Sequence, residues 1–269
     1  MDREKNRKDL EARLNEVGLT LEIYEKKPPK YVRVRVGTPR KEWEKTGLAG
    51  VFRSRDPTIG QSGAYLRGDF EIMDLASYLP VLALKLEKGQ SLLDMCAAPG
   101  GKALAAWDLF QAKLICVEKN RKRFSQMKTR FEQNRVPAEC VLGDAVRVGG
   151  EWERILLDAP CSGEGIVTRF DDVLEKTENQ IRRLAKRQFR MLKRAYHILA
   201  PGGTLVYATC ALNTRENEGV VEKFLWKEQE AILEVPEPLG DVDTQKTRFG
   251  MRVVPGKTRG LFAARIKKP

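Results

Sequence analysis

The chain has 269 residues, enough for a full-sized hydrophobic core, and 42% of them are apolar while 32% are charged. Lysine and arginine outnumber aspartate and glutamate by 49 to 37, and the formal net charge of +12 favours a polyanionic partner such as nucleic acid. Five cysteines without a Cys-x-x-Cys pair and a single histidine do not supply the usual ligand set of a zinc site, so no bound metal is expected.

The N-terminus and the apolar segments favour a cytosolic protein. The charged N-terminus lacks the apolar core of a signal peptide, and no apolar stretch approaches the roughly 20 residues of a membrane span. An odd number of cysteines suits a reducing compartment. His197 stands near the end of a predicted helix, where we expect a structural role, so hydrolases that depend on a histidine are disfavoured.

Residues 1–70 predict a small α+β region. Apolar residues at helical spacing, followed by Gly18, indicate a first helix with a glycine at its C-terminal cap. Residues 31–36 alternate with period two, which predicts a half-buried strand with Arg33 and Arg35 pointing outward. Glycines and prolines then interrupt regular structure. The basic face of this strand would contact either RNA or only water.

Residues 71–269 predict a mostly parallel, doubly wound α/β sheet. A short helix is expected at 71–79, and a series of apolar segments with the composition of strands follows it. Helical segments separate most of these strands, which is the pattern of a sheet with helices on both faces. The expected strands are 91–95, 113–118, 139–142, 154–157 and 204–207, and the expected later helices are 121–134 and 178–199.

A glycine-rich turn and two acids at strand ends predict a nucleoside site. The turn Pro99-Gly100-Gly101 opens a helix, and Glu118 ends the next strand, where an acid accepts hydrogen bonds from ribose hydroxyls. The turn matches neither the Walker pattern nor G-x-G-x-x-G, so nucleoside triphosphates and dinucleotides are disfavoured as ligands. A cofactor without a pyrophosphate is favoured, S-adenosylmethionine first of all, and Asp144 is placed to hydrogen-bond its adenine.

Two cysteines follow predicted strands at the edge where such sheets bind ligands. Cys161 lies in an Asp-Ala-Pro-Cys-Ser-Gly segment after one strand, and Cys210 follows a Tyr-Ala-Thr segment that ends another. Ligands of open α/β sheets bind outside the carboxyl ends of the strands, so both thiols are expected near the cofactor. Two thiols beside a carboxylate, Asp158, and a glycine-rich turn indicate covalent chemistry.

Three motifs resemble the Nop2/Sun (Fmu) family of RNA cytosine-5 methyltransferases. They are Leu-Asp-Met-Cys-Ala-Ala-Pro-Gly-Gly-Lys at 93–102, Asp-Ala-Pro-Cys-Ser-Gly at 158–163 and Tyr-Ala-Thr-Cys at 207–210. Shorter matches at 74–77, 143–145, 199–203 and 216–218 extend the resemblance, in order, over roughly residues 63–269. The resemblance implies a Rossmann-like S-adenosylmethionine methyltransferase sheet over 71–269, with a small N-terminal α+β appendage over 1–70 that binds RNA.

The resemblance implies a set of cofactor-binding residues. The turn after the first strand of the sheet would wrap S-adenosylmethionine, Glu118 would hold the ribose hydroxyls and Asp144 the adenine. Arg123 matches a family arginine on the helix after Glu118, and Asp158 would lie near both the methionine end and the target base. The residues of the turn are Cys96, Ala97, Ala98, Pro99, Gly100, Gly101 and Lys102.

The resemblance also assigns the catalytic residues. Cys210 would be the nucleophile that adds to C6 of cytosine and so makes C5 able to accept a methyl group, and the attacking group must be the thiolate. Asp158 would neutralise negative charge on the ring. Cys161 would assist breakdown of the covalent adduct.

Three other functions remain open at this stage. A DNA cytosine-5 methyltransferase would use Cys161 as the nucleophile and leave Cys210 idle. A catalytically silent RNA-binding assembly factor would have lost its chemistry, although both thiols, Asp158 and the glycine-rich turn are retained. A methyltransferase acting on amino or amide groups would usually carry an Asn/Asp-Pro-Pro-Tyr motif, which Asp-Ala-Pro-Cys does not match.

The RNA is either ribosomal or transfer RNA, and basic residues would hold its phosphates while the target base is flipped out or taken from a loop. A basic face on the helix 178–199 is interpreted as solvated. Trp43 and Phe70 are expected to pack in a core in preference to stacking on bases. The favoured RNA contacts are Arg33, Arg35, Lys41, Arg53, Arg55 and Arg67.

Overall fold

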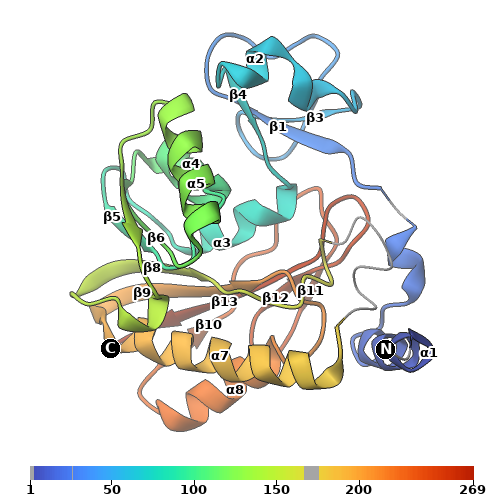
Figure 1. The fold of residues 1–269 in the computed structure, drawn as a ribbon, viewed down its shortest axis with the longest axis vertical. Helices are drawn as coiled ribbons and strands as arrows, with labels where there is room; N and C mark the ends of the chain where they lie inside the picture. Colours follow the sequence, from blue (N-terminus) through green and yellow to red (C-terminus); the bar gives the residue numbers. More distant parts are fainter. Residues whose placement is uncertain (1–2, 26, 167–175) are drawn as a thin grey trace.

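The computed structural model describes residues 3–25, 27–166 and 176–269. Within them the main sheet has the strand order β11-β12-β13-β9-β8-β5-β6-β7, and β10 pairs with β13 beside this path (Figure 1). Strands β5 to β9 run parallel, as predicted, and the last four strands are antiparallel. The bounds are β5 (Ser91–Asp94), β6 (Lys113–Glu118), β7 (Ala138–Leu142), β8 (Trp152–Asp158), β9 (Leu199–Thr209), β10 (Ile232–Glu234), β11 (Thr244–Lys246), β12 (Met251–Val253) and β13 (Leu261–Lys267).

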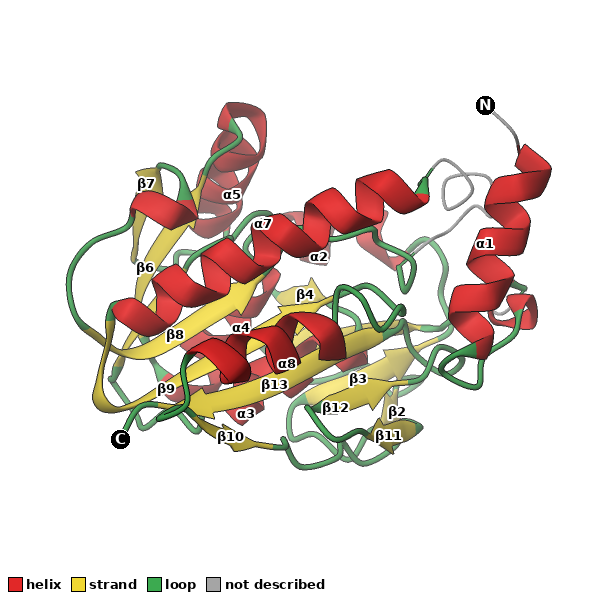
Figure 2. Ribbon diagram, turned by 90° about the horizontal axis from the view of Figure 1, so that it is seen from below, coloured by secondary structure: helices red, strands yellow, loops and turns green. Residues whose placement is uncertain are grey.

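Helices cover both faces of the main sheet. One face packs against α3 (Tyr78–Ala83), α4 (Gly101–Phe110) and α5 (Arg121–Gln133), and the other against α7 (Glu178–His197) and α8 (Glu218–Lys227), as Figures 1 and 2 show. Successive residues of a strand point to opposite faces, so Leu156 joins the first core while Ile155 and Leu157 join the second. This double burial explains why the strands are apolar throughout.

A second, smaller sheet lies in the N-terminal part of the chain. Its order is β2-β3-β1-β4, all antiparallel, with the short helix α2 (Gly63–Leu66) beside it. The bounds are β1 (Lys30–Val34), β2 (Glu44–Lys45), β3 (Val51–Ser54) and β4 (Phe70–Ile72). Trp43 and Phe70 pack edge to face with ring centroids 5.3 Å apart, so the expectation of core packing is confirmed. The division of the chain at residue 70 stays a prediction.

The predicted helix at 71–79 is wrong over its first half. Residues 70–72 form β4, which pairs with β1 because the side chain of Phe70 enters the small core beside Trp43. Asp74 then caps a short 3-10 turn by accepting from the N–H of Ala76 at 3.1 Å, and α3 begins at Tyr78. Pairing with a distant strand therefore overrides the helical spacing of the apolar residues.

The predicted first helix is confirmed as α1 (Arg3–Asn15), and Gly18 ends this segment with a φ of 71°. The apolar side of α1 does not join the N-terminal sheet. Leu10 and Leu14 instead pack against Leu212, which lies just past the end of β9. Figure 1 shows α1 beside the start of α7, so the first residues of the chain contact the part that carries the two cysteines.

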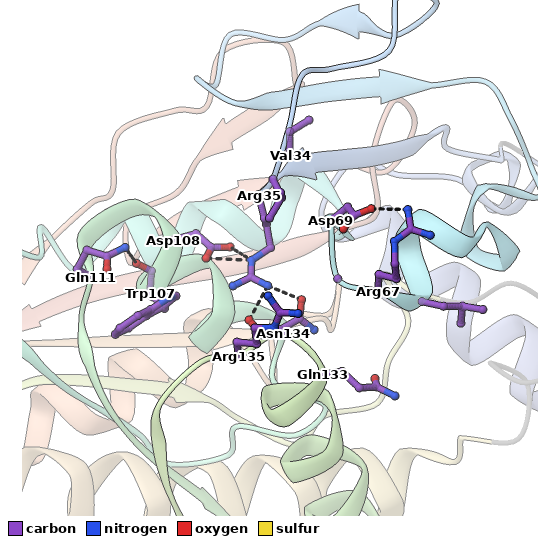
Figure 3. A pocket seen from close by; sticks show the side chains of 13 residues that line it. Val34, Arg35, Arg67, Asp69, Trp107, Asp108, Gln111, Gln133, Asn134 and Arg135 are labelled. Carbon is purple, nitrogen blue, oxygen red and sulfur yellow. Dashed lines mark hydrogen bonds and ion pairs between the residues drawn. The ribbon is translucent and has the colours of Figure 1, made fainter.

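Arg33 and Arg35 do not point into solvent, which corrects the prediction for this strand. Both guanidinium groups pair with Asp108 on α4, and the side chain of Arg33 is 3% exposed. Arg35 also donates to the carbonyl and side-chain oxygens of Asn134, at 2.9 and 2.6 Å (Figure 3). The alternation of the strand is present, but the larger part of the molecule covers its polar face. These two arginines hold the two sheets together beside a cavity of about 640 Å³.

Among the described residues, none of the helices is both long enough and apolar enough to cross a bilayer.

Replacing Asp108 by alanine is expected to lower the free energy of unfolding by about 3 kcal/mol, because two buried arginines lose their shared counter-ion. Urea denaturation of the purified chain measures this. Asp69→Ala is the matched control, since Asp69 pairs with the exposed Arg67, and its effect should stay below about 1 kcal/mol. Equal effects of the two substitutions would show that Asp108 does not hold the sheets together.

Candidate active site

The structure brings the two predicted cysteines together at one edge of the main sheet. Strands β8 and β9 are parallel neighbours with Asp158 opposite Ala208, so the loops that carry Cys161 and Cys210 leave the sheet side by side. The two Sγ atoms are 2.8 Å apart, and the N–H of Cys210 donates to Cys161 Sγ at 3.2 Å. The thiols are therefore in hydrogen-bond contact although 49 residues separate them in the sequence.

The hydrogen bond between the thiols distinguishes their protonation. It raises the pKa of Cys161 well above the usual range, and burial raises it further. Cys161 is therefore favoured in its protonated form, and either sulfur can donate in the contact between the thiols. A thiolate needs a positive neighbour, and the Lys102 ammonium is within electrostatic reach of Cys210.

Lys102 and Asp158 form an ion pair next to the thiols. Lys102 Nζ donates to Asp158 Oδ2 at 2.7 Å, and both side chains are largely buried. Burial alone would lower the pKa of Lys102, but the charge and hydrogen bond of Asp158, with the charges of Cys210 and Asp94, together outweigh burial and raise it. Lys102 therefore stays charged. The two cysteines, Asp158 and Lys102 of the glycine-rich turn therefore lie close together.

The glycine-rich turn joins β5 to α4 and leaves the start of that helix uncapped by any side chain. Gly100 has a φ of 97°, and a Cβ on it would lie 2.9 Å from the ring of Phe131, so only glycine fits. The first N–H groups of α4 point out of the helix and, with the helix dipole, favour an anionic ligand group. This arrangement suits the carboxylate end of a nucleoside cofactor.

Glu118 and Arg123 lie beside the turn. Glu118, at the end of β6, is buried and accepts from the N–H of Asn120 at 2.7 Å. Arg123 Nη1 lies 3.5 Å from Glu118 Oε2, and its Nη2 donates to the carbonyl of Ala98. Arg123 therefore ties the carboxylate to the turn.

Asp144 follows β7 and has two contacts within the protein. Its Oδ2 accepts from Lys119 Nζ at 2.5 Å, and this hydrogen bond lowers the pKa of Asp144. Its Oδ1 accepts from the N–H of Val146 at 3.3 Å, which caps a short 3-10 turn at Ala145–Arg147. Asp144 therefore has a structural role whether or not it also binds a ligand.

Asp94 is a site residue that the sequence analysis missed. It ends the central strand β5, is 1% exposed, and accepts from the N–H of Cys96 at 3.3 Å. Burial first, and then the charge of Asp158, raise its pKa to about 7. The signal was present in the sequence, because the same strand-end position drew attention to Glu118 and Asp144.

The remaining cysteines and the histidine lie apart from the thiol pair. Cys116 is buried in the core, and Cys96 and Cys140 pack against the two cores, as expected of small apolar side chains. His197 is exposed at the end of α7, at the edge of the sheet opposite the two thiols. In the described ranges no group of three or more His, Cys, Asp or Glu side chains is placed to hold a metal ion.

The strand order, the uncapped glycine turn after β5 and the acids at or just beyond the ends of β5, β6 and β7 define a Rossmann-like methyltransferase. The chain belongs to the family described as 16S rRNA methyltransferase RsmB/F, whose model matches residues 81–267. The resemblance to the Nop2/Sun family is thereby confirmed.

Known proteins match most of this chain. It is 31% identical to "Ribosomal RNA small subunit methyltransferase B" of Cronobacter sakazakii over 92% of this chain and 62% of that protein. The structure of a methyltransferase homologue from Pyrococcus horikoshii matches with a TM-score of 0.76 and 27% identity, over 92% of this chain and 89% of that one. The structure of NSun6 from Pyrococcus horikoshii with SFG matches with a TM-score of 0.68 and 27% identity, over 81% and 59%. The chain spans 49% to 62% of the length of three curated relatives.

The pKa of Asp94 predicts a pH-dependent stability. Because this pKa is raised above the value of about 3.9 in an unfolded chain, the folded state holds an extra proton between about pH 4 and pH 7. Stability from this group is present below pH 4 and is lost as the pH rises through 7. Asp94→Asn cannot bind or release this proton. From pH 5 to pH 8 the free energy of unfolding of the wild type should therefore fall by roughly 2 kcal/mol more than that of Asp94→Asn.

Urea denaturation at pH 5 and pH 8 measures the difference for Asp94→Asn. Asp243→Asn, at an exposed position, is the control and should follow the wild type. If all three proteins have parallel pH profiles, Asp94 is an ordinary carboxylate.

Proposed function

We propose that the chain transfers a methyl group from S-adenosylmethionine to C5 of a cytosine in RNA, through an adduct between Cys210 and C6. The observation that carries the proposal is the contact between the two thiols, whose sulfur atoms are 2.8 Å apart, with the ion pair of Lys102 and Asp158 next to them. A Rossmann-like methyltransferase needs no thiol to bind its cofactor, so two thiols in contact at the ligand edge indicate covalent catalysis. The curated relatives named for ribosomal RNA make small-subunit ribosomal RNA the first substrate to test, with transfer RNA beside it.

S-adenosylmethionine fits the residues around the turn. Its sulfonium supplies an electrophilic methyl group to the reaction. The residues from Cys96 to Lys102 and the start of α4 would hold the methionine end, Glu118 the ribose and Asp144 the adenine. Arg123, which contacts both Glu118 and the carbonyl of Ala98, would hold Glu118 in position beside the turn. The buried carboxyl of Asp94 suits a cofactor with cationic sulfonium and ammonium groups, which would favour its charged form. NSun6 was crystallised with SFG, an analogue of this cofactor.

The chemistry follows from the positions of the side chains. The Cys210 thiolate forms a bond to C6, and the electron pair of the C5–C6 double bond moves toward C5 and the ring. Lys102 and Asp158, paired at 2.7 Å next to the thiols, would stabilise that charge through a proton shared with the base. Once Cys210 has become a thioether, Cys161 no longer shares its proton with a thiolate, and that proton would pass to solvent water.

Release of the product needs a base beside the adduct. The proton on C5 must be removed while the bond between C6 and the sulfur of Cys210 breaks. Cys161, 2.8 Å from that sulfur, can accept the proton after losing its own.

Substituting the two cysteines separates their roles. With labelled S-adenosylmethionine and unmodified ribosomal RNA, transfer RNA or DNA, the wild type should place label in 5-methylcytidine of RNA. Cys210→Ala should lose label by at least about 1000-fold, in line with other catalytic nucleophiles. Cys161→Ala should accumulate a covalent protein–RNA adduct that survives denaturing electrophoresis.

Other outcomes identify the alternatives. Label in DNA that depends on Cys161 would point to a DNA methyltransferase, and cofactor binding without label would point to a silent RNA-binding factor. Cys116→Ala, a core cysteine away from the pair, is the control and should form no adduct.

A basic cleft adjoins the loop of the nucleophile, and we propose that it holds the RNA strand. It encloses about 620 Å³ between the N-terminal sheet and the main sheet. Gly165 lines it and donates through its N–H to the carbonyl of Cys210 at 2.7 Å, so the cleft reaches the catalytic loop. Lysine and arginine side chains dominate its charged lining, which suits phosphates. They are Lys27, Lys30, Arg53, Arg55 and Arg259.

Arg55→Ala combined with Arg259→Ala should raise the KM for RNA about five-fold or more, with little change in kcat, because both side chains line the cleft and are partly or fully exposed. The salt dependence of RNA binding should also become shallower by about one to two in slope. Filter binding and steady-state methylation measure the two effects.

Lys88→Ala is the control for the cleft, since Lys88 is exposed just before β5, at the edge of the sheet opposite the thiols. A double variant with the wild-type KM and salt slope would place the RNA elsewhere.

A further inference from the structure

A buried carboxylate, Glu164, joins the loops that follow the two cysteines. Its side chain is 0% exposed and lies three residues after Cys161. Its Oε2 accepts from the N–H groups of Leu212 and Asn213, each at 3.1 Å, and from Asn213 Nδ2 at 2.8 Å. These donors come directly after Cys210. Glu164 therefore fixes one cysteine loop against the other.

A second buried carboxylate extends the same network. Glu216 Oε1 accepts from the N–H of Ser162 at 3.0 Å and from Gln188 Nε2 at 2.8 Å, and its Oε2 accepts from Asn213 Nδ2 at 2.8 Å. Gln188 also donates to the carbonyl of Pro160 at 3.0 Å. Both sides of Cys161 are thus tied, through Asn213, to the loop after Cys210.

The positive charge in this network comes from the N-terminal helix. Arg13 on α1 is 3% exposed, and its Nε donates to Glu164 Oε1 at 3.1 Å. Arg13 also pairs with Glu178 at the start of α7. Leu10 and Leu14 hold the helix in place by packing on Leu212. The counter-ion of Glu164 therefore lies 151 residues away, outside the region that the family model matches.

We propose that Arg13 is a positioning residue, which through Glu164 holds the Cys161 and Cys210 loops at the separation that their thiol contact requires. The proposal rests on the proposed function for its kinetic consequence, but the contact between the thiols is independent of substrate. A buried carboxylate that loses its counter-ion draws in water or a proton, and either change alters how strongly Glu164 accepts from Leu212 and Asn213. The sulfur atoms then move relative to each other.

A double-mutant cycle on the full chain tests the coupling. Arg13→Met keeps the length of the side chain and should lower kcat for RNA methylation at least ten-fold, with the KM for S-adenosylmethionine within two-fold of the wild type. Glu164→Gln keeps an oxygen acceptor for the loop and should lower kcat three- to ten-fold. In the Glu164→Gln background, Arg13→Met should cost less than two-fold, because no buried charge is left without a partner.

Arg7→Met on the same helix is the matched control and should keep the wild-type kcat, since Arg7 pairs with Glu11 on the surface. An equal loss from Arg13→Met in both backgrounds would overturn the proposal, because Arg13 would then not act through Glu164. If Arg13→Met shows no cooperative melting, Glu164→Gln decides alone, and a wild-type kcat in that variant would overturn the proposal.

Thiol alkylation gives a readout that needs neither RNA nor cofactor. The rate of carboxamidomethylation of Cys210 by iodoacetamide, followed by mass spectrometry from pH 6 to pH 10, reports on its contact with Cys161. Arg13→Met should change that rate at least three-fold and shift its pH profile, whereas Arg7→Met should not. If the wild type does not methylate RNA but Arg13→Met still shows this shift, only the proposed function is contradicted. A methylating wild type with an unchanged profile in folded Arg13→Met would sink the positioning role alone.

Discussion

The parallel pairing of β8 with β9 is the constraint on which the candidate site depends. Both strands are buried on both faces, so a slip of one residue would turn apolar side chains of one core toward the other. The register that places Asp158 opposite Ala208 therefore also fixes where the two cysteine loops begin. The backbone bonds from Ala159 to Ala208 and from Gly165 to Cys210 continue this pairing beyond the strands. The contact between the thiols follows from the geometry of the sheet.

The charges around the thiols balance over a short range. Asp94 is buried with a raised pKa, so it can be neutral near pH 7, while Lys102 stays charged beside Asp158. Glu164 is neutralised by direct contact with Arg13, which comes from a distant part of the sequence, and Glu216 accepts from neutral donors. Among the described residues around the thiols, Lys102 supplies a positive charge, and it belongs to the glycine-rich turn. In the proposed function the cofactor site and the nucleophile would share this side chain, so their electrostatics would not be independent.

The sequence predicted the main sheet and the meeting of Cys161 and Cys210 at one edge of it, because both follow from local rules. Apolar runs marked the strands, and side chains at the carboxyl ends of parallel strands must gather at one edge, as Cys161 and Cys210 do. It failed at residues 71–79 and at Arg33, where a distant strand and a covering helix decide the structure. Arg13 and Glu164 are 151 residues apart, and no periodicity encodes such a pair. The catalytic roles themselves stay predictions.

The contacts of the glycine-rich turn and those of the thiol pair come from different parts of the chain. The turn, Glu118, Arg123 and Asp144 are held by contacts within residues 81–267, the region of the family match. The thiol loops depend in addition on α1, and the basic cleft on residues 23–30 and 53–57. Under the proposed function, changes confined to the first 60 residues would impair catalysis and leave binding of the cofactor intact. The N-terminal part would then act at the chemical step as well as in holding RNA, because it supplies the counter-ion of Glu164.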